Sequence, residues 1–155
     1  MDGIVRGLAE GGRLVTGGRR PPHLDRGCFV EPTILADVPA DAWAWREEVF
    51  GPAPCVRPFD TEDEAVALAD DNRHGLAAAV MSGDDARAER MAQAFRAGLV
   101  WVDRSQPTFT QAPRGGMKAS GIGRELGRWG FEAFQEVKQA TRLDAREAWG
   151  WCGVG

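Results

Sequence analysis

The sequence predicts an α/β fold with a mainly parallel sheet and flanking helices. Three apolar segments, 53–59, 76–82 and 99–103, have the length and composition of strands. Two segments with helical periodicity, 61–72 and 84–98, separate them. Because strand, helix, strand, helix, strand is the order in which helices connect parallel strands, these segments predict parallel pairs in one sheet.

The N-terminal third is expected to contribute one helix and two extended segments. Residues 3–10 carry apolar side chains at helical spacing, and a pair of glycines ends that helix. The segment 13–18 resembles a strand that enters a glycine turn, and 18–27 is a polar, proline-rich loop. Residues 28–38 alternate well enough to be extended, and Pro32 places them at an edge or a bend.

The two central helices carry recognisable end signals. Thr61 is expected to cap the helix over 61–72, and Glu64 three residues later completes a capping box. The helix over 84–98 has acidic residues in its first turn and Gly98 at its end. These signals make the two helices the best-defined elements of the prediction.

The C-terminal part combines a glycine-rich crossing with two further elements. Residues 111–127 cross the fold, 124–136 are predicted to be helical, and 136–143 are predicted to form a final strand. The last residues, 144–155, contain glycine and tryptophan without any period. We therefore expect one domain over 1–143 followed by a tail.

Size, charge and cysteine usage narrow the class of protein. A chain of 155 residues allows one ordinary domain, and a net charge of −4 argues against nucleic acid or an anionic membrane as the partner. The sequence contains neither a run of 18 apolar residues nor a secretory signal. Cys28, Cys55 and Cys152 are odd in number and lack metal-binding spacing, so we expect no metal site. Reduced thiols and a cytoplasmic location are the expectation.

Five segments together resemble the C-terminal part of the catalytic domain of NAD(P)-dependent aldehyde dehydrogenases. They are "GCFVEPTIL", "EEVFGP", "NRHGLAAAV", "AGLVWVD" and "PRGGMKASGIGRELGRWGFEAFQEVK", beginning at residues 27, 47, 72, 97 and 113. Their order and spacing are similar to those of the betaine-aldehyde branch of the family. The resemblance covers nearly the whole chain, and any one segment alone would be weaker evidence.

The resemblance implies roles for two residues and two segments. Glu48 resembles the glutamate that binds the hydroxyls of the nicotinamide-side ribose, and Phe50 resembles the aromatic residue that packs near the nicotinamide. The glycines over 115–123 resemble the loop beside the substrate channel. The segment 136–143 resembles the strand through which subunits of the family pair.

The family's chemistry also needs parts with no counterpart in these 155 residues. Members of the family are longer and carry a Rossmann-like domain, a nucleophilic cysteine and a general-base glutamate. Hydride transfer needs a thiolate to form the thiohemiacetal and a bound nicotinamide to accept the hydride. We therefore expect no autonomous NAD-dependent oxidation and no cofactor for the isolated chain. NAD(P) is expected only where a partner chain supplies the Rossmann domain and the cysteine.

Four residues depart from the family's pattern. Asp103 stands where the family usually has asparagine, Arg114 and His74 stand where an aromatic is common, and Phe134 replaces a tyrosine. Asp103 and Arg114 place charge where the resemblance puts the channel wall. They are either substitutions on a surface that has lost its partner domain, or an ion pair or binding site for a polar ligand.

The candidate site follows from these residues. The predicted catalytic residues are Glu48, Asp103 and Arg114, and the predicted ligand pocket is lined by Trp45, Trp101 and His74. Glu48 beside an aromatic is suited to general acid–base chemistry without redox. Alternatively, Glu48 caps a turn or pairs with Arg46 or another arginine, and the tryptophans are core residues.

Three functions remain open at this point. In the first, the chain is a repurposed family member that binds or transforms a small molecule by non-redox chemistry, for example in a biosynthetic pathway. Alternatively, it is half of a split dehydrogenase completed in trans, or an interaction module for full-length subunits. In each case the face that normally packs on the cofactor domain would be uncovered, and apolar faces of that size are rarely left in water. We therefore expect a homo-oligomer, a two-fold homodimer in the simplest case.

Overall fold

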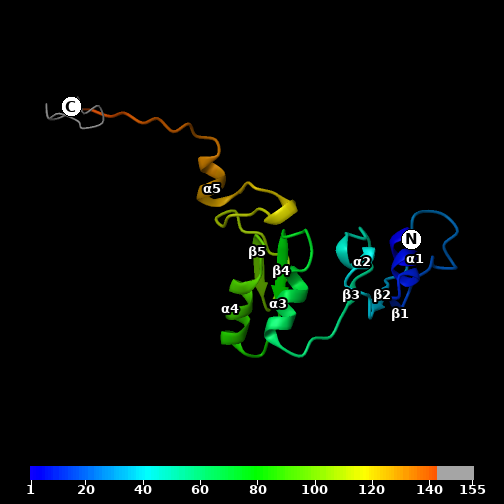
Figure 1. The fold of residues 1–155 in the computed structure, drawn as a ribbon. Helices are drawn as coiled ribbons and strands as arrows, with labels where there is room; N and C mark the ends of the chain where they lie inside the picture. Colours follow the sequence, from blue (N-terminus) through cyan, green and yellow to red (C-terminus); the bar gives the residue numbers. More distant parts are fainter. Residues whose placement is uncertain (143–155) are drawn as a thin grey trace, which may run out of the picture.

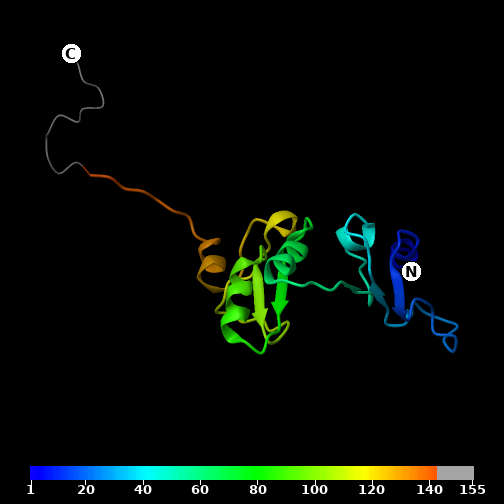
Figure 2. The same ribbon diagram turned by 60° about the horizontal axis from the view of Figure 1, so that its bottom comes forward.

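The computed structural model describes residues 1–142, which form two lobes joined by one extended segment (Figures 1 and 2). The N-terminal lobe comprises residues 1–56 and the C-terminal lobe residues 62–135. The connecting residues 57–61 run between them without regular structure up to the first helix of the second lobe. Within residues 1–142, no helix has the length and apolar character needed to cross a bilayer.

The N-terminal lobe consists of a three-stranded sheet with two helices. Helix α1 (Asp2–Ala9) precedes strands β1 (Arg13–Thr16) and β2 (Ile34–Ala36), and the short helix α2 (Trp43–Arg46) precedes β3 (Cys55–Val56). The strand order is β1-β2-β3. The β1–β2 pair is antiparallel with an irregularity in register, and the β2–β3 pair is parallel.

A small apolar core holds this lobe together. Ile4 of α1, Leu35 of β2 and Ala44 of α2 are buried in one cluster. Gly7 permits the close approach of α1, because a β-carbon there would lie 3.0 Å from both the Ala44 Cβ and the Leu35 Cδ1. Burying these side chains stabilises the lobe by about 1.5–3 kcal/mol for each large one.

The C-terminal lobe is built on two parallel strands and two helices. Helix α3 (Glu62–Asp70) leads into β4 (Ala77–Val80), and helix α4 (Asp85–Ala94) leads into β5 (Leu99–Val102). The strands pair in register from Ala77 opposite Leu99 to Val80 opposite Val102. Two parallel strands joined by a helix confirm the predicted α/β class.

The predicted starts of the helices over 61–72 and 84–98 are confirmed, with one difference in detail. The Thr61 hydroxyl accepts a hydrogen bond from the Glu64 N–H at 3.1 Å. The Glu64 carboxylate does not reach back to Thr61 itself but accepts the Asp60 N–H at 2.8 Å. At α4, the Asp84 carboxylate accepts the Arg87 N–H at 3.0 Å. Each cap satisfies an N–H that lacks a partner inside its helix.

The glycine-rich crossing packs backbone against backbone. It contains the 3₁₀ turn η1 (Lys118–Ser120) and is followed by helix α5 (Gly127–Glu132). A β-carbon at Gly98, at the start of β5, would collide with the Gly115 carbonyl. The Gly75 N–H donates to the Ser120 Oγ at 2.9 Å. Close packing of this segment on the strand ends therefore requires glycine at Gly98.

The single sheet predicted from the sequence is wrong. β3 pairs with β2 in one sheet, while β4 and β5 form a second sheet. The segment 57–61 carries the chain away from β3 before α3 begins, so β3 does not reach the edge of β4. The β1–β2 pair is also antiparallel, although both other pairs are parallel.

Two predicted helices are shorter than their periodicity suggested. The helix over 84–98 ends at Ala94, because Phe95 is extended and the Asp70 carboxylate accepts the Arg96 N–H at 3.0 Å. The helix over 124–136 is limited to α5. Its expected first residues are extended instead, since Glu125 exchanges two backbone hydrogen bonds of 2.7 Å with Arg114.

The predicted pairing strand over 136–143 has no neighbouring strand among residues 1–142, and its pairing with another subunit stays a prediction. Residues 136–142 are exposed and form no strand. Figures 1 and 2 show this segment leading away from α5 with no second strand beside it. A strand needs a hydrogen-bonding neighbour, and none of the described part of the chain offers one. Residue 143, the tail over 144–155 and Cys152 lie outside the described residues.

Candidate functional site

Glu48 and Phe50 lie on the sharp turn that follows α2. The Glu47 N–H donates to the Trp43 carbonyl at 2.8 Å and ends the helix. Phe50 then adopts the left-handed conformation, with φ of 53°, and its side chain is 88% exposed. The Glu48 side chain is also exposed. A non-glycine residue held at positive φ is uncommon, and such strain is often found at functional sites.

Glu48, Trp45 and His74 line one cavity of about 430 Å³ between the two lobes. The backbone N–H of His74 donates to the Asn72 Oδ1 at 2.8 Å, which fixes the loop between α3 and β4. The His74 Nε2 atom is buried and has no hydrogen-bond partner within the described residues. A buried ring nitrogen without a partner is costly, so it indicates a place where a further polar group fits.

Two ion pairs hold the lobes together beside this cavity. The Arg46 guanidinium contacts the Asp71 carboxylate at 2.8 Å, and Glu47 lies 3.6 Å from Arg73. The suggested pairing of Glu48 with Arg46 is therefore wrong, because Arg46 pairs with Asp71. Both pairs are partly exposed, so each contributes at most about 1 kcal/mol.

Asp103 and Arg114 lie at opposite ends of β5. Asp103 follows β5 in the left-handed conformation, with φ of 52°, and its carboxylate accepts the Ser82 N–H at 2.9 Å. Arg114 exchanges backbone hydrogen bonds with Glu125, and its Nε lies 3.9 Å from the Glu125 Oε1. Asp103 and Arg114 therefore do not form the ion pair considered from the sequence.

A second cavity, of about 300 Å³, is lined by Trp101 and Arg114. The Trp101 indole N–H donates to the Pro107 carbonyl at 3.0 Å. Asp103 lines neither this cavity nor the cavity at Glu48. The structure therefore divides the predicted site residues among three places, with Asp103 apart from both cavities, and the three predicted catalytic residues share neither of them. Their catalytic role stays a prediction.

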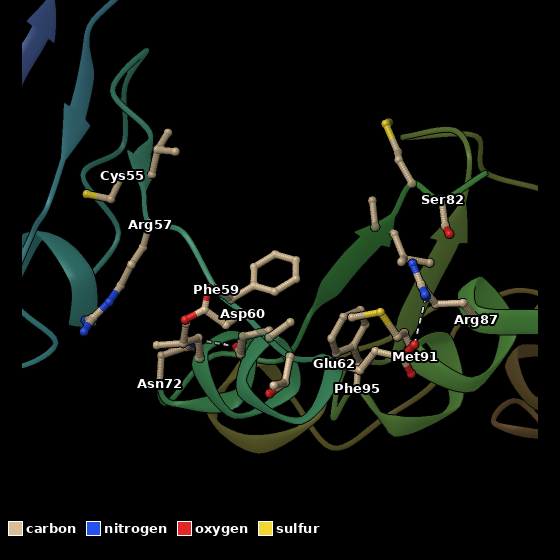
Figure 3. Close-up of a pocket in the computed structure, with 18 of the residues that line it drawn as sticks. Cys55, Arg57, Phe59, Asp60, Glu62, Asn72, Ser82, Arg87, Met91 and Phe95 are labelled. Carbon is tan, nitrogen blue, oxygen red and sulfur yellow. Dashed lines mark hydrogen bonds and ion pairs between the residues drawn. The ribbon is translucent and has the colours of Figure 1, made fainter. Parts of the chain in front are cut away.

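A larger cavity, of about 960 Å³, was not predicted from the sequence (Figure 3). Cys55 and Arg57 lie on one side of it, and Met91 and Phe95 lie across from them. Burial raises the pKa of the Cys55 thiol, whose Sγ lies 3.4 Å from the Ala44 carbonyl. No motif signals this cavity, because its walls are apolar and polar residues from both lobes that are distant in the sequence.

A charged cluster closes one end of this cavity. The Arg87 guanidinium on α4 contacts the Glu62 carboxylate on α3 at 2.8 Å, and Arg90 contacts the same carboxylate at 3.1 Å. These pairs join the first turn of α3 to α4. Among residues 1–142, no three His, Cys, Asp or Glu side chains are grouped so as to hold a metal ion.

Comparison with known proteins decides the family. The model of the aldehyde dehydrogenase family matches residues 1–140. The chain belongs to the aldehyde dehydrogenase family. The resemblance seen in the five sequence motifs is thereby confirmed.

Curated members of the aldehyde dehydrogenase family are similar over almost the whole chain. A peroxisomal aminoaldehyde dehydrogenase of Pisum sativum is 56% identical over 148 residues, which is 96% of this chain and 29% of that protein. The chloroplastic betaine aldehyde dehydrogenase of Amaranthus hypochondriacus is 54% identical over 149 residues, or 96% of this chain and 30% of that protein. This aldehyde dehydrogenase chain thus spans about 30% of the length of its curated relatives.

Solved structures agree with the fold. Apo betaine aldehyde dehydrogenase from Staphylococcus aureus superimposes with a TM-score of 0.84 at 40% identity, over 97% of this chain and 30% of that one. The same enzyme in complex with NAD+ gives a TM-score of 0.81 at 43% identity, over 86% of this chain and 28% of that one. The two lobes are therefore arranged as in the corresponding part of a complete aldehyde dehydrogenase.

Proposed function

We propose that this chain is the C-terminal part of an NAD(P)-dependent aldehyde dehydrogenase that is active only together with the remainder of the enzyme. That remainder, on the same or on a separate polypeptide, supplies the cofactor domain and the nucleophilic cysteine. Identity of 56% to an aminoaldehyde dehydrogenase supports this proposal. The "EEVFGP" motif, which resembles that of the family, supports it too, because cofactor-binding residues without a cofactor would be free to vary.

The observation that carries the proposal is the apolar surface of the described residues. Large apolar side chains that are at least half exposed include Phe50, Phe131, Phe134 and Val137. In the core, by contrast, the fully buried apolar side chains larger than alanine are few. A monomeric protein rarely exposes so much apolar surface in water. Further polypeptide packed on these lobes would bury it.

Glu48 and Phe50 fit a role in holding the cofactor. The exposed Glu48 carboxylate accepts hydrogen bonds and suits a pair of ribose hydroxyls. Phe50 presents a free aromatic ring on which a planar heterocycle can pack. NAD(P), when bound, accepts the hydride from the substrate. Because these two residues form only one wall of such a site, the isolated chain is expected not to bind NAD(P).

The test compares the chain alone with the completed enzyme. Calorimetry with NAD+ should show no binding to the chain alone. Adding the polypeptide that corresponds to the remaining part of a relative should restore NADH formation from an aldehyde. Glu48→Gln should then raise the KM for NAD+ by about tenfold, since one charge-assisted hydrogen bond is lost. Glu47→Gln, a change at the neighbouring glutamate that pairs with Arg73, is the matched control.

Two results would overturn the proposal. One is micromolar affinity of the isolated chain for NAD+. The other is a completed, folded assembly that forms no NADH with any aldehyde tested. A KM for NAD+ that responds equally to Glu47→Gln and Glu48→Gln would remove Glu48 from the cofactor site.

A second candidate function is non-redox binding or acid–base chemistry at the cavity of Glu48. The unpartnered His74 Nε2 favours it, because a small polar ligand there would satisfy that nitrogen. In this case Glu48→Gln and His74→Ala would each abolish binding of the ligand to the isolated chain. Unchanged small-molecule content of cells that carry either variant would remove this candidate.

The same exposed surface leads us to propose that the isolated chain self-associates as a homodimer. Residues 136–141 form no strand with the rest of the described chain, so they can pair with another copy or with a full-length subunit. Light scattering at micromolar concentration is expected to show a species larger than a monomer. A stable monomer would contradict this expectation.

Reduced thiols also fit the cytoplasm, which remains our proposal for the compartment.

A further inference from the structure

The cavity at Trp101 combines apolar walls with a single charge. Its volume is about 300 Å³, and its apolar lining includes Leu99, Trp101 and Phe109. Among the residues that line it, Arg114 is the one with a charged side chain. The indole N–H of Trp101 is already bonded to the Pro107 carbonyl at 3.0 Å, so Trp101 offers the cavity an apolar face.

Arg114 is held at this cavity by its backbone. Its N–H and its carbonyl both bond to Glu125 at 2.7 Å, which clamps the loop that carries Arg114 across the start of β5. The neighbouring Gly115 packs its carbonyl against Gly98, so the loop lies directly on the strand end. The position of Arg114 is therefore fixed by main-chain contacts that its side chain does not supply.

The guanidinium of Arg114 is only weakly neutralised. Its contact with Glu125 is 3.9 Å long, and the two side chains are 45% and 69% exposed. An exposed pair at this distance contributes little, so it does not commit the five N–H donors of the guanidinium. A second arginine, Arg104, lies 5.9 Å from the ring of Phe109 and adds positive charge nearby.

A cavity with these properties selects its ligand by charge. A carboxylate accepts two parallel hydrogen bonds from a guanidinium, which makes this a strong and directional contact. The apolar walls suit a short hydrocarbon body. A ligand with an ammonium group would instead meet like charge at Arg114, with no acidic side chain in the lining to offset it.

We propose that this cavity binds the far end of an aldehyde substrate, and that the substrate is an anionic aldehyde with a carboxylate at that end. This inference rests on the proposed dehydrogenase function and names its substrate class. It differs from the relatives, whose names specify aminoaldehydes and betaine aldehyde, because those compounds carry a cationic nitrogen. Arg114 is the residue that determines the specificity.

The test uses three four-carbon aldehydes with the completed enzyme. They are 4-oxobutanoate, butanal and 4-aminobutanal, which carry an anionic, a neutral and a cationic end. We expect kcat/KM to fall in that order. Arg114→Gln should lower the ratio of kcat/KM for 4-oxobutanoate to that for butanal by about 10- to 100-fold, the effect of losing hydrogen bonds to a charged group. Arg114→Lys should retain part of the preference.

A matched control and a second measurement keep the outcomes distinct. Arg128→Gln removes an exposed arginine that pairs with Glu132 on α5, and it should leave the ratio unchanged. A preference for 4-aminobutanal, or an equal loss with every aldehyde in Arg114→Gln, would overturn the inference. If no aldehyde is oxidised, the indole N–H signal of Trp101 in the 155-residue chain is followed during titration with butyrate and with butylammonium. A shift with butyrate alone would uphold the anion site while the proposed function fails, and equal responses would remove the site as well.

Discussion

Replacing Lys118 tests what holds the glycine-rich crossing in place. The Lys118 ammonium donates to the Asp70 carbonyl at 3.1 Å, to the Asp70 Oδ1 at 3.2 Å and to the Asn72 carbonyl at 3.5 Å. The Lys118 side chain is 13% exposed and that of Asp70 is 21% exposed. Lys118 also has a positive φ of 53°, so these contacts offset a strained backbone.

The expected cost of Lys118→Met follows from this geometry. Each hydrogen bond to a charged group contributes about 1.5–3 kcal/mol, but the bond to Asn72 is long and water reaches part of the site. Methionine keeps most of the apolar stem. The Asp70 carboxylate also keeps the Arg96 N–H at 3.0 Å, so it is not left without a partner. We expect a loss of about 2 kcal/mol in the free energy of unfolding, or a roughly 30-fold shift in the unfolding equilibrium.

The assay is urea unfolding of the 155-residue chain, followed by tryptophan fluorescence and far-UV circular dichroism. Asp70→Asn and the double variant complete a cycle, in which Lys118 and Asp70 should couple by about 1 kcal/mol. Arg128→Met, which removes an 82% exposed arginine, should cost no more than about 0.5 kcal/mol. The reasoning would be refuted if Lys118→Met cost no more than this control or if the coupling were zero.

Three further predictions concern the helix caps and the thiols. Thr61→Ala should lower the free energy of unfolding by about 1 kcal/mol, because the hydroxyl caps α3. Thr61→Ser keeps a hydroxyl and should lose much less, so equal losses for the two variants in urea unfolding would exclude the cap. The hydrogen bond from the Arg87 N–H lowers the pKa of the Asp84 carboxyl in the folded state below its unfolded value near 3.8. The charged carboxylate therefore stabilises the fold fully above the unfolded pKa, and this stability is lost as the pH falls through the folded pKa. The difference in unfolding midpoint between the wild type and Asp84→Asn should therefore shrink below about pH 4, and a constant difference would contradict this. Burial raises the pKa of the Cys55 thiol, whereas Cys28 is exposed. Iodoacetamide at pH 8 should therefore alkylate Cys28 before Cys55, as followed by peptide mass spectrometry, and faster labelling of Cys55 would contradict its burial.

Local sequence signals predicted α3 and α4 and the places where they start, but they missed α2 and the start of α5. Thr61 and Asp84 cap α3 and α4, because a cap depends on residues within one turn of the chain. The ends were less well predicted. Asp70, which is 26 residues away from Arg96, captures the Arg96 N–H and turns the chain before Gly98. The sequence around residue 96 does not predict that contact, because Asp70 is distant in the chain.

The candidate site was predicted only in part, because its residues come together through long-range packing. Glu48 and His74 line one cavity, but Arg114 lies at another, where its bridge to Glu125 places it. The large cavity at Cys55 escaped prediction since its walls come from both lobes. The expected strand over 136–143 has the composition of a strand, and composition alone provides no partner.

The sequence by itself determined the family and the α/β class, because motifs such as "EEVFGP" identify the family from a few adjacent positions. Tertiary structure decided how the predicted site residues are distributed. It split the sheet in two, left Phe50 and α5 exposed, and set Arg114 on an apolar cavity as its only charge. The reason is physical: strand pairing, burial and the charge around a cavity depend on segments distant in the chain, which no local pattern specifies.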